Sequence, residues 1–569
     1  MSQASIPITN QPSIVLPKEG VRARLSSVVA PFLLSVSLFA LNNLAIISGW
    51  LKPPDGYSAM FLIRAQDIAQ YFAWANGYLQ QNLVPSYHAP WITEPAFFNL
   101  FIWAIAKISK LVSLEPVSTY HVFHFLFYVV ATYALVYAAR VFTQGSAQFW
   151  AVFLVSICVV PLPSLAALPQ FLTGKGGAPA GIGYFVWSSS DGFFHGISGS
   201  ALVTFGTAAT LLGFSLFAQY LKTEQRRYFV YALLTVLISA LVHATEAILL
   251  TGAGGLALFW WRGREWKRAI PDGFLLGLAL MCGLSPYIYM VFRHVWLRDL
   301  ASLTHGGTPG LPHELPFILG LPAILVVGFL ALRPKLFKPT DRLLLCWFGF
   351  VLIGIYVPVI HWRQHLFDGF HYATAILLVR LASQSAFFDR LRIRQPLMLW
   401  GAAGMICLLS ISAYAIYYRQ SFLDGRRPTP ERLFSSVASR EEVAVIDWIR
   451  QNARADELVL APPDNAPWLG MAPIHTFAGH WIWSFSFSDQ LRLANRFYKG
   501  EMSAEEAHQL IADYGFRYVV VNATSLAASY LEGAEKRVDL GKLSIYEFKG
   551  NTMKPYPGLK ALQRSAVTN

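Results

Sequence analysis

The chain has 569 residues, of which 55% are hydrophobic and only 14% are charged. Soluble globular proteins carry about 25% charged residues, so this composition excludes an ordinary soluble protein and indicates a membrane protein. The formal net charge is +13, but the basic residues cluster in short loops between apolar runs, for example at 222–227 and 262–268. Membrane proteins show this bias in their cytoplasmic loops, so the charge predicts no nucleic-acid binding.

A positively charged segment precedes the first apolar run. Lys18, Arg22 and Arg24 lie just before residues 26–49. That run is too long for the apolar region of a signal peptide, and no small-residue cleavage site follows it. We therefore expect residues 1–25 to be a cytoplasmic tail and residues 26–49 to be the first membrane helix.

Further apolar runs follow, each close to the ~20 residues that a helix needs to cross a bilayer. They lie near 95–114, 118–139, 148–168, 198–221, 228–243, 244–262, 272–293, 315–333, 342–360, 369–388 and 396–418. The polar residues from His243 to Glu246 predict a break within the long stretch 228–262. Because exposed strands leave backbone groups unsatisfied in lipid, the predicted fold is an α-helical polytopic membrane protein with about 11–13 transmembrane helices.

The four cysteines all lie inside apolar runs. They are Cys158, Cys282, Cys346 and Cys407, and no two are close in the sequence. This pattern indicates small core residues, and it favours neither a disulfide framework nor a metal site.

The composition changes near residue 425, where a soluble α/β domain is predicted to begin. Within 440–550, helical spacing marks 441–451, and short apolar runs at 457–461 and 517–521 predict strands. Residues 503–514 predict a helix that opens with a capping box from Ser503 to Glu506. The tail 551–569 is expected to be disordered.

The first loop, residues 51–94, contains a candidate catalytic residue. Residues 58–81 are predicted to form an amphipathic helix that could lie flat at the membrane surface, with Asp67, Tyr71, Trp74 and Tyr78 on one face. A carboxylate that is partly desolvated beside aromatic rings is a candidate general base. The alternative is a solvated Asp67 on an exposed helix face.

Two more ionisable residues, His88 and Glu94, lie just before the next apolar run. Glu94 precedes Pro95 at an expected helix start, where the helix dipole stabilises a carboxylate. This stabilisation is enough to explain a glutamate at position 94, and a substrate or ion contact is the alternative explanation.

Several segments together resemble one family. An Asp-led helix (QDIAQYFAWANGYLQ) followed by a Pro-initiated run (TEPAFFNLFIW) is similar to a bacterial branch of the GT-C superfamily of polyprenyl-phosphate-sugar-dependent membrane glycosyltransferases. LVHATEAILL at 241–250 is similar to its His-Pro motif, with Ala244 in place of the proline. HWRQHLFDGFHYATAILL at 361–378 resembles its late basic segment, and Gly479-His480-Trp481 resembles part of its soluble domain.

The resemblance implies an architecture and a reaction. The expected parts are a transmembrane domain at 26–424 and an extracytoplasmic domain at 425–550, in the inner (plasma) membrane. The implied enzyme transfers a sugar with inversion from a polyprenyl-phosphate donor to a lipid, glycan or protein acceptor, with Asp67 as catalytic base. Superfamily members often carry an acidic pair in this loop, and here both Asp55 and Glu94 stay open as the partner.

Other ionisable residues lie at membrane boundaries. His243 and Glu246 share one helical face in an apolar stretch, where such residues usually pair or line a cavity. Arg363 is the candidate for the donor phosphate, because a guanidinium makes two parallel bonds to phosphate, although an ordinary cytoplasmic loop is the alternative. The full set of predicted substrate-binding residues is Tyr71, His88, Glu94, His243, Glu246, Arg363, His371 and His480.

His361, His365 and His371 do not have the spacing of a standard metal site, and His243 with Glu246 are too few ligands, so no metal ligand is assigned. No cofactor is indicated, and a requirement for a divalent metal is left open. Two other functions remain as alternatives. A transporter or flippase usually shows internal repeats, which the sequence lacks, and a polysaccharide polymerase or ligase would also use lipid-linked sugars. The expected partners are the lipid-linked donor, the acceptor and the bilayer.

Overall fold

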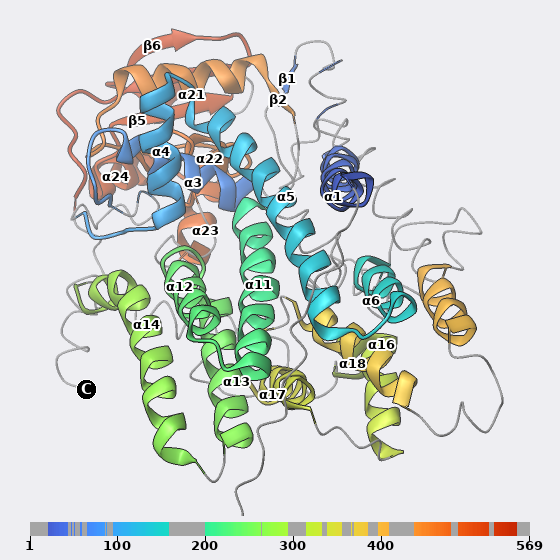
Figure 1. The fold of residues 1–569 in the computed structure, drawn as a ribbon. Helices are drawn as coiled ribbons and strands as arrows, with labels where there is room; N and C mark the ends of the chain where they lie inside the picture. The colour runs from blue at the N-terminus through green and yellow to red at the C-terminus, as the bar shows by residue number, and fades with distance from the viewer. Residues whose placement is uncertain are drawn as a thin grey trace, which may run out of the picture.

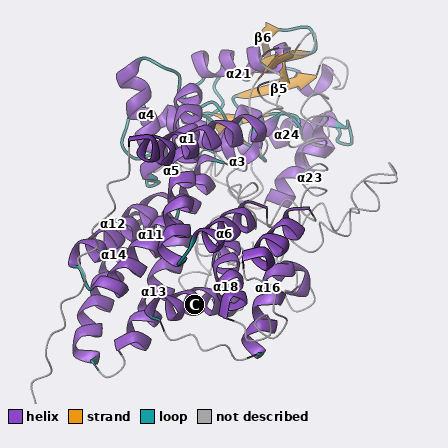
Figure 2. Cartoon of the chain, turned by 45° about the vertical axis from the view of Figure 1, so that its right-hand side comes forward, coloured by secondary structure: helices purple, strands orange, loops and turns teal. Residues whose placement is uncertain are grey.

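The structure is a bundle of helices with a small α/β domain at one end (Figure 1). This computed structural model describes residues 21–43, 47, 51, 57–59, 65–85, 87, 95–158, 200–262, 265–293, 315–332, 338–354, 366, 369–384, 396–408, 437–479, 487–522 and 528–554. The strands gather at the end of the bundle that carries the α/β domain, and helices make up the rest (Figure 2). We call this the domain end and the other the opposite end.

The bundle helices coincide with the predicted apolar runs. They are α1 (Val21–Asn42), α5 (Pro116–Phe142), α6 (Ser146–Cys158), α11 (Ala201–Thr223), α12 (Arg226–Val242), α13 (Ala244–Arg262), α14 (Trp266–Arg293), α16 (Leu315–Ala331), α17 (Pro339–Gly354), α18 (Phe370–Gln384) and an unlabelled helix, Pro396–Leu408. Within the described ranges, α5, α11, α13 and α14 are long and apolar enough to cross a membrane. Large apolar side chains such as Phe274, Phe292 and Met405 face outward, as expected for a polytopic membrane protein.

The predicted break in the stretch 228–262 is confirmed. Helix α12 ends at Val242, His243 has extended backbone angles, and α13 begins at Ala244. The polar residues thus occupy a junction between two helices instead of the middle of one.

One predicted span is different. The run near 95–114 forms α4 (Leu100–Val112), whose 13 residues reach only about 20 Å at 1.5 Å per residue. Its buried side chains, including Phe101 and Ile105, share a hydrophobic core with Val445 and Ile449 of the α/β domain. Because α4 packs against α3, α5 and α12, the apolar pattern that predicted a membrane span reflects contact with protein here.

The opposite end is held by a buried ionic network. The Asp272 carboxylate is fully buried and pairs with Arg226 and, at 3.0 Å, with Arg262. The Tyr220 hydroxyl donates to Asp272 at 2.5 Å and accepts from Arg262 at 2.9 Å. These contacts join four helices, α11 to α14, and no sequence pattern had marked Asp272.

A second buried pair lies at the same end. Arg380 of α18 pairs with Asp341 of α17 and also donates to the Phe142 carbonyl, at 2.9 Å, where α5 ends. Lys222 at the end of α11 donates to the neighbouring Val141 carbonyl. Basic side chains thus satisfy the last carbonyls of α5, which no helical N–H can reach.

The cysteines do not all lie apart. Cys158 at the end of α6 and Cys407 near the end of Pro396–Leu408 are within hydrogen-bonding distance of each other. The Cys407 thiol also donates to the Leu154 carbonyl, one turn before Cys158, at 3.9 Å. Their distance in the sequence had hidden this contact.

The α/β domain is built on a five-stranded sheet in the order β4-β3-β5-β7-β6. The strands are β3 (Leu458–Leu460), β4 (His475–Thr476), β5 (Tyr518–Asn522), β6 (Glu535–Asp539) and β7 (Leu543–Glu547). The first three are parallel, and β7 pairs antiparallel with β5 and β6. The helices are α21 (Arg440–Asn452), α22 (Ala466–Leu469), α23 (Phe487–Tyr498), α24 (Ala504–Tyr514) and the 3-10 turn η4 (Ala528–Leu531).

The predicted elements of this domain are confirmed. The expected strands correspond to β3 and β5, and the expected helices to α21 and α24. The capping box from Ser503 to Glu506 is formed, and a second joins Ser439 and Glu442 at the start of α21. The local signals worked here because capping depends only on neighbouring residues.

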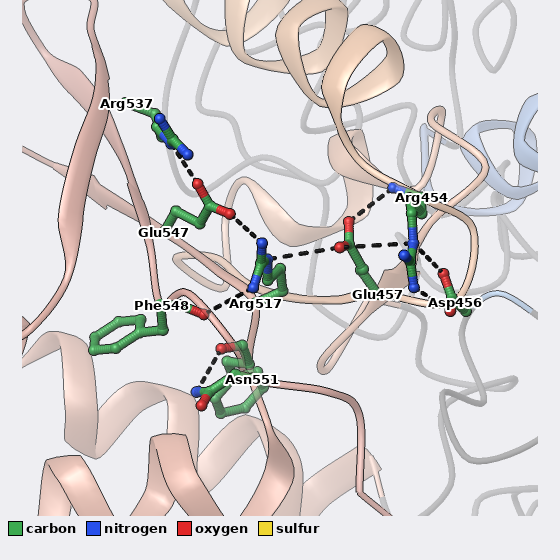
Figure 3. A network of polar contacts seen from close by, with 9 residues as sticks. Arg454, Asp456, Glu457, Arg517, Arg537, Glu547, Phe548 and Asn551 are labelled. Carbon is green, nitrogen blue, oxygen red and sulfur yellow. Dashed lines mark hydrogen bonds and ion pairs between the residues drawn. The ribbon is translucent and has the colours of Figure 1, made fainter.

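Ionic contacts tie the strand ends together (Figure 3). Arg517, just before β5, pairs with Glu547 at the end of β7 and lies 3.6 Å from Glu457. Glu547, which is 6% exposed, also pairs with Arg537 of β6. This network joins parallel and antiparallel parts of one sheet, which supports a structural role.

Part of the predicted disordered tail is ordered. Asn551 donates from its side chain to the Phe516 carbonyl at 3.0 Å, and the Lys554 backbone N–H donates to Tyr514 at 3.1 Å. The chain therefore packs against the end of α24 through residue 554. Residues 555–569 lie outside the described part.

Candidate functional site

The first loop and the α/β domain form one unit. Strand β1 (Tyr57–Ala59) pairs antiparallel with β2 (Val437–Ser439). The Asn76 side chain donates to the Met471 carbonyl at 3.0 Å. These contacts join segments almost 400 residues apart in the sequence, so the loop is fixed by the C-terminal domain.

Tyr87 provides a second connection. Its carbonyl accepts from the Thr476 N–H at 3.2 Å and from His475 Nδ1 at 3.1 Å. Burial lowers the pKa of His475 to about 4, so the imidazole is neutral and carries its proton on Nδ1. Tyr87 precedes the predicted His88, and Thr476 lies four residues before the predicted His480, but neither histidine is in the described part.

Helix α3 (Ala65–Tyr78) carries the Asp-led pattern, but the predicted helix 58–81 is wrong at its start, because Tyr57–Ala59 form strand β1. Residues 69–78 are buried or half-buried on every side, against α4, α5 and α22. Phe72, Trp74 and Tyr78 are all at most 2% exposed. The prediction of an amphipathic helix at a membrane surface was wrong, because alanines and Gly77 allow close packing on the other faces as well.

Close packing of α3 is enforced at Gly77. A Cβ atom at this position would lie 2.4 Å from the Tyr87 hydroxyl and 2.8 Å from a Val84 methyl. The helix therefore needs glycine where the loop after it folds back. Of the predicted residues on this helix, Tyr71 is half-buried and stacks on Trp74, with ring centres 6.2 Å apart. The Asp67 side chain is outside the described part.

Gln70, one turn after Asp67, was not predicted. Its side chain is fully buried, and both amide atoms lack a hydrogen-bond partner among the described residues. An unsatisfied buried amide is unfavourable by about 1–3 kcal/mol. Such a group in the helix that carries Asp67 is a candidate substrate contact, and only its burial could have revealed it.

Hydrogen bonds connect α3 to the membrane bundle. The Tyr78 hydroxyl donates to the Phe97 carbonyl at 2.9 Å and accepts from the Asn99 N–H at 3.1 Å. The Asn99 side chain caps α4 and also donates to the Val242 carbonyl at 2.8 Å. Val242 precedes His243, so Asn99 links Tyr78 of the first loop to the junction between α12 and α13.

At that junction, the predicted pair of ionisable residues is in contact. His243 Nδ1 and Glu246 Oε2 are 2.6 Å apart, and Glu246 is 1% exposed. Glu246 lies in the first turn of α13, where the helix dipole stabilises a carboxylate. Its other oxygen, Oε1, has no hydrogen-bond partner among the described residues and faces Gly206 of α11. Mutual pairing thus satisfies only half of the carboxylate.

The predicted His371 lies in the first turn of α18. It is 2% exposed, and neither ring nitrogen has a hydrogen-bond partner in the part of the chain that the structure describes. Gly369, two residues earlier, adopts φ +86°, and a Cβ there would lie 3.1 Å from Thr210 of α11. The start of α18 therefore packs one helical turn from the Gly206 position that Glu246 approaches.

The remaining predicted residues, His88, Glu94, Arg363 and His480, lie outside the described residues. That Arg363 and Asp67 lie close enough to contact one sugar-phosphate therefore stays a prediction. In the ranges that are described, no three His, Cys, Asp or Glu side chains come together as a metal site would require. A metal requirement stays open, as it was from the sequence.

The chain is similar to three solved membrane proteins. The Archaeoglobus fulgidus oligosaccharyltransferase, in complex with Zn and sulfate, aligns with a TM-score of 0.52 and 14% identity over 87% of this chain and 68% of its own. The arabinofuranosyltransferase AftD from mycobacteria aligns with a TM-score of 0.48 and 12% identity, over 92% of this chain but 40% of its own. ArnT from Cupriavidus metallidurans aligns with a TM-score of 0.47 and 10% identity, over 92% of this chain and 98% of its own.

Neither a protein-family model nor a curated protein sequence matches the chain. At such low identities, the oligosaccharyltransferase alignment establishes the fold alone. The chain has the GT-C fold, with a polytopic helical membrane part and a C-terminal sheet domain. The fold class that the sequence predicted is therefore confirmed.

Proposed function

We propose that this chain is a membrane glycosyltransferase that moves a sugar, with inversion, from a polyprenyl-phosphate donor to an acceptor at the domain end. The observation that carries the proposal is the unsatisfied carboxylate oxygen of Glu246. It lies at a junction that is hydrogen-bonded, through Asn99 and Tyr78, to the helix that carries Asp67. Intramembrane ionisable groups with unmet hydrogen bonds mark substrate paths.

The fold favours the same activity. The aligned Archaeoglobus fulgidus protein is an oligosaccharyltransferase. A fold hosts many functions, so the proposal depends on the site and takes only added weight from the fold.

The orientation follows from charge. Arg226, Arg262 and Arg380 gather at the opposite end. Basic residues of this kind favour the cytoplasmic side of a membrane. The proposed active site, at the domain end, is then extracytoplasmic, where a lipid-linked donor is the available activated sugar.

In the proposed mechanism, Asp67 removes the proton from the attacking acceptor hydroxyl. The acceptor oxygen forms a bond to the anomeric carbon as the bond from that carbon to the phosphate oxygen breaks. The lipid phosphate leaves with the electron pair, and Arg363 is the candidate cation that stabilises its charge. Attack from the face opposite the phosphate produces inversion.

The test is Asp67→Asn in the purified full-length protein, incubated with a panel of polyprenyl-phosphate sugars and candidate acceptors. Removing the base is expected to lower transfer by about 10²–10⁴-fold, because asparagine keeps the size but cannot take the proton. Released lipid phosphate is the readout. Asp489→Asn, on an exposed turn of α23, is the matched control and should retain full activity.

Wild-type transfer rates in the folded Asp67→Asn variant would show that another group is the base. If the wild-type protein releases no lipid phosphate from any donor in the panel, the proposed activity itself is wrong.

A further inference from the structure

The turn of α11 from Gly206 to Thr210 lies beside buried polar atoms that have no hydrogen-bond partner among the described residues. A Cβ on Gly206 would lie 2.2 Å from Glu246 Oε1, so only glycine leaves room for that oxygen. Thr210 lies four residues further along the same face of α11, and its buried hydroxyl has no hydrogen-bond partner among the described residues. His371 lies two residues after Gly369, which packs on Thr210, and neither of its ring nitrogens has a hydrogen-bond partner among the described residues.

These groups come from three helices, and each is at most 2% exposed or has a fully buried polar atom. A buried polar group without a partner is unfavourable by about 1–3 kcal/mol, and more for a charged group. Three such groups near one helical turn are difficult to explain by packing, because apolar residues would fill the same space at lower cost. By contrast, they suit a ligand that brings several hydrogen-bonding groups.

We infer that Glu246, Thr210 and His371 form a subsite for the hydroxyl groups of the transferred sugar, and that the subsite selects a neutral sugar over a uronic acid. This inference rests on the proposed function. Glu246 Oε1 accepts a hydrogen bond from one sugar hydroxyl. Thr210 can donate or accept, and the His371 imidazole offers one donor and one acceptor.

Selection against acidic sugars follows from charge. One Glu246 oxygen is bonded to His243 Nδ1, and the other presents negative charge to the subsite. A sugar carboxylate placed there would meet a like charge in a medium of low dielectric constant, where the repulsion is strong. No basic side chain among the described residues pairs with Oε1 to cancel it.

The experiment uses the full-length protein in detergent with three kinds of synthetic polyprenyl-phosphate donor. One carries a neutral sugar that the wild type transfers, the second kind carries its monodeoxy analogues, and the third carries the corresponding uronic acid. For the wild type, removing the hydroxyl that binds Glu246 should lower kcat/KM by roughly 10- to 100-fold, as expected for a hydrogen bond to a charged group. The uronic acid should be transferred more slowly still.

The variants are Thr210→Val, Thr210→Ser and Gly206→Ala. Thr210→Val keeps the shape but removes the hydroxyl, so it should lower kcat/KM for the neutral donor. It should also reduce the ratio of kcat/KM between the neutral donor and the deoxy analogue that lacks the hydroxyl bound by Thr210. Thr210→Ser should restore both. Gly206→Ala should displace Glu246 and lower transfer, whereas Gly254→Ala, where the new methyl has ordinary 3.5 Å contacts with Phe217 between the same two helices, should have no effect.

The outcomes separate this inference from the proposed function. If no donor is transferred by the wild type, the glycosyltransferase proposal fails first. If the wild type transfers sugar but treats hydroxyl, deoxy and uronic donors alike, the subsite is wrong. If Thr210→Val and Gly206→Ala lower the thermal midpoint without changing donor preference, buried water satisfies these atoms and the inference is also wrong.

Discussion

The two ends of the helical bundle treat buried polar groups in opposite ways. At the opposite end, Asp272 is paired with two arginines and a tyrosine, and Asp341 is paired with Arg380. At the domain end, Glu246 is paired through one oxygen only, and its other oxygen has no hydrogen-bond partner among the described residues. Both ends contain buried carboxylates. Both oxygens of Asp272 and of Asp341 have partners, whereas one oxygen of Glu246 has none among the described residues.

The difference separates two uses of a buried ionisable residue. A carboxylate that is completely paired by its own chain holds helices together, and it has little capacity left for a ligand. A carboxylate with an open oxygen reduces stability and keeps that capacity, as binding sites commonly do. Both Asp272 and Glu246 are buried, so burial alone does not distinguish them. The number of carboxylate oxygens with hydrogen-bond or ion-pair partners does.

The largest change in stability that tests this comparison is expected from a substitution at the opposite end. Asp272→Ala leaves the guanidinium of Arg262, only 9% exposed, without its partner, and should lower the free energy of unfolding by about 3–5 kcal/mol. Transfer activity of the folded fraction should be unchanged. The measurement is denaturant unfolding in detergent, alongside an activity assay.

Glu265→Ala is the control, since Glu265 pairs with Arg268 at the surface near the same helices. An exposed pair contributes about 0–1 kcal/mol. If Asp272→Ala is as stable as this control, or selectively loses activity, the assignment of the opposite end to structure is wrong.

A smaller change in stability, which depends on pH, is expected from His475. Its imidazole is buried like that of His371 but lies in the α/β domain. Its Nε2 has no hydrogen-bond partner among the described residues, and its folded-state pKa is about 4 against 6.5 for an exposed histidine. Because the pKa is lower in the folded state, the unfolded chain binds the proton first. Stability that is present above pH 6.5 is therefore lost as the pH falls toward 4, by at most about 3 kcal/mol.

His475→Asn should remove this dependence, because an amide can still donate to Tyr87 and does not titrate. The thermal midpoint, measured from pH 7 to pH 4, should fall less steeply in this variant than in the wild type. His508→Asn on α24 is the control and should follow the wild type. Parallel curves for all three proteins would refute the prediction.

The smallest effect concerns the packing of α6 against Pro396–Leu408. Because the Cys158 and Cys407 thiols are in hydrogen-bonding distance, mild oxidation should join them in an intramolecular disulfide without loss of activity. Mass spectrometry after digestion should find this pair, with Cys282 and Cys346 still reduced. Oxidised protein in which all four thiols can still be alkylated would contradict this packing.

Local patterns predicted most of the elements. The apolar runs located the bundle helices, the polar residues at 243–246 located the break between α12 and α13, and capping residues located α24. These features depend on residues that are neighbours in the sequence. The pairing of His243 with Glu246 could be predicted for the same reason, since residues three apart on a helix face the same way.

Long-range contacts could not be predicted. Helix α4 looked like a span because an apolar face has the same pattern whether lipid or neighbouring protein helices cover it. Gln70 and Thr210 are ordinary polar residues in the sequence, and their importance appears only because none of the described residues hydrogen-bonds to their buried side-chain atoms. Asp272 was overlooked because its partners come from three other helices.

The sequence by itself determined that the chain is a polytopic helical membrane protein with a C-terminal α/β domain, because apolar length and local capping dictate these features. Only the tertiary structure decided which buried polar atoms are paired and which are open, and that the first loop is built into the C-terminal domain. Hydrogen-bond partners hundreds of residues apart leave no mark on local composition, so the contrast between the two ends exists only in the folded protein.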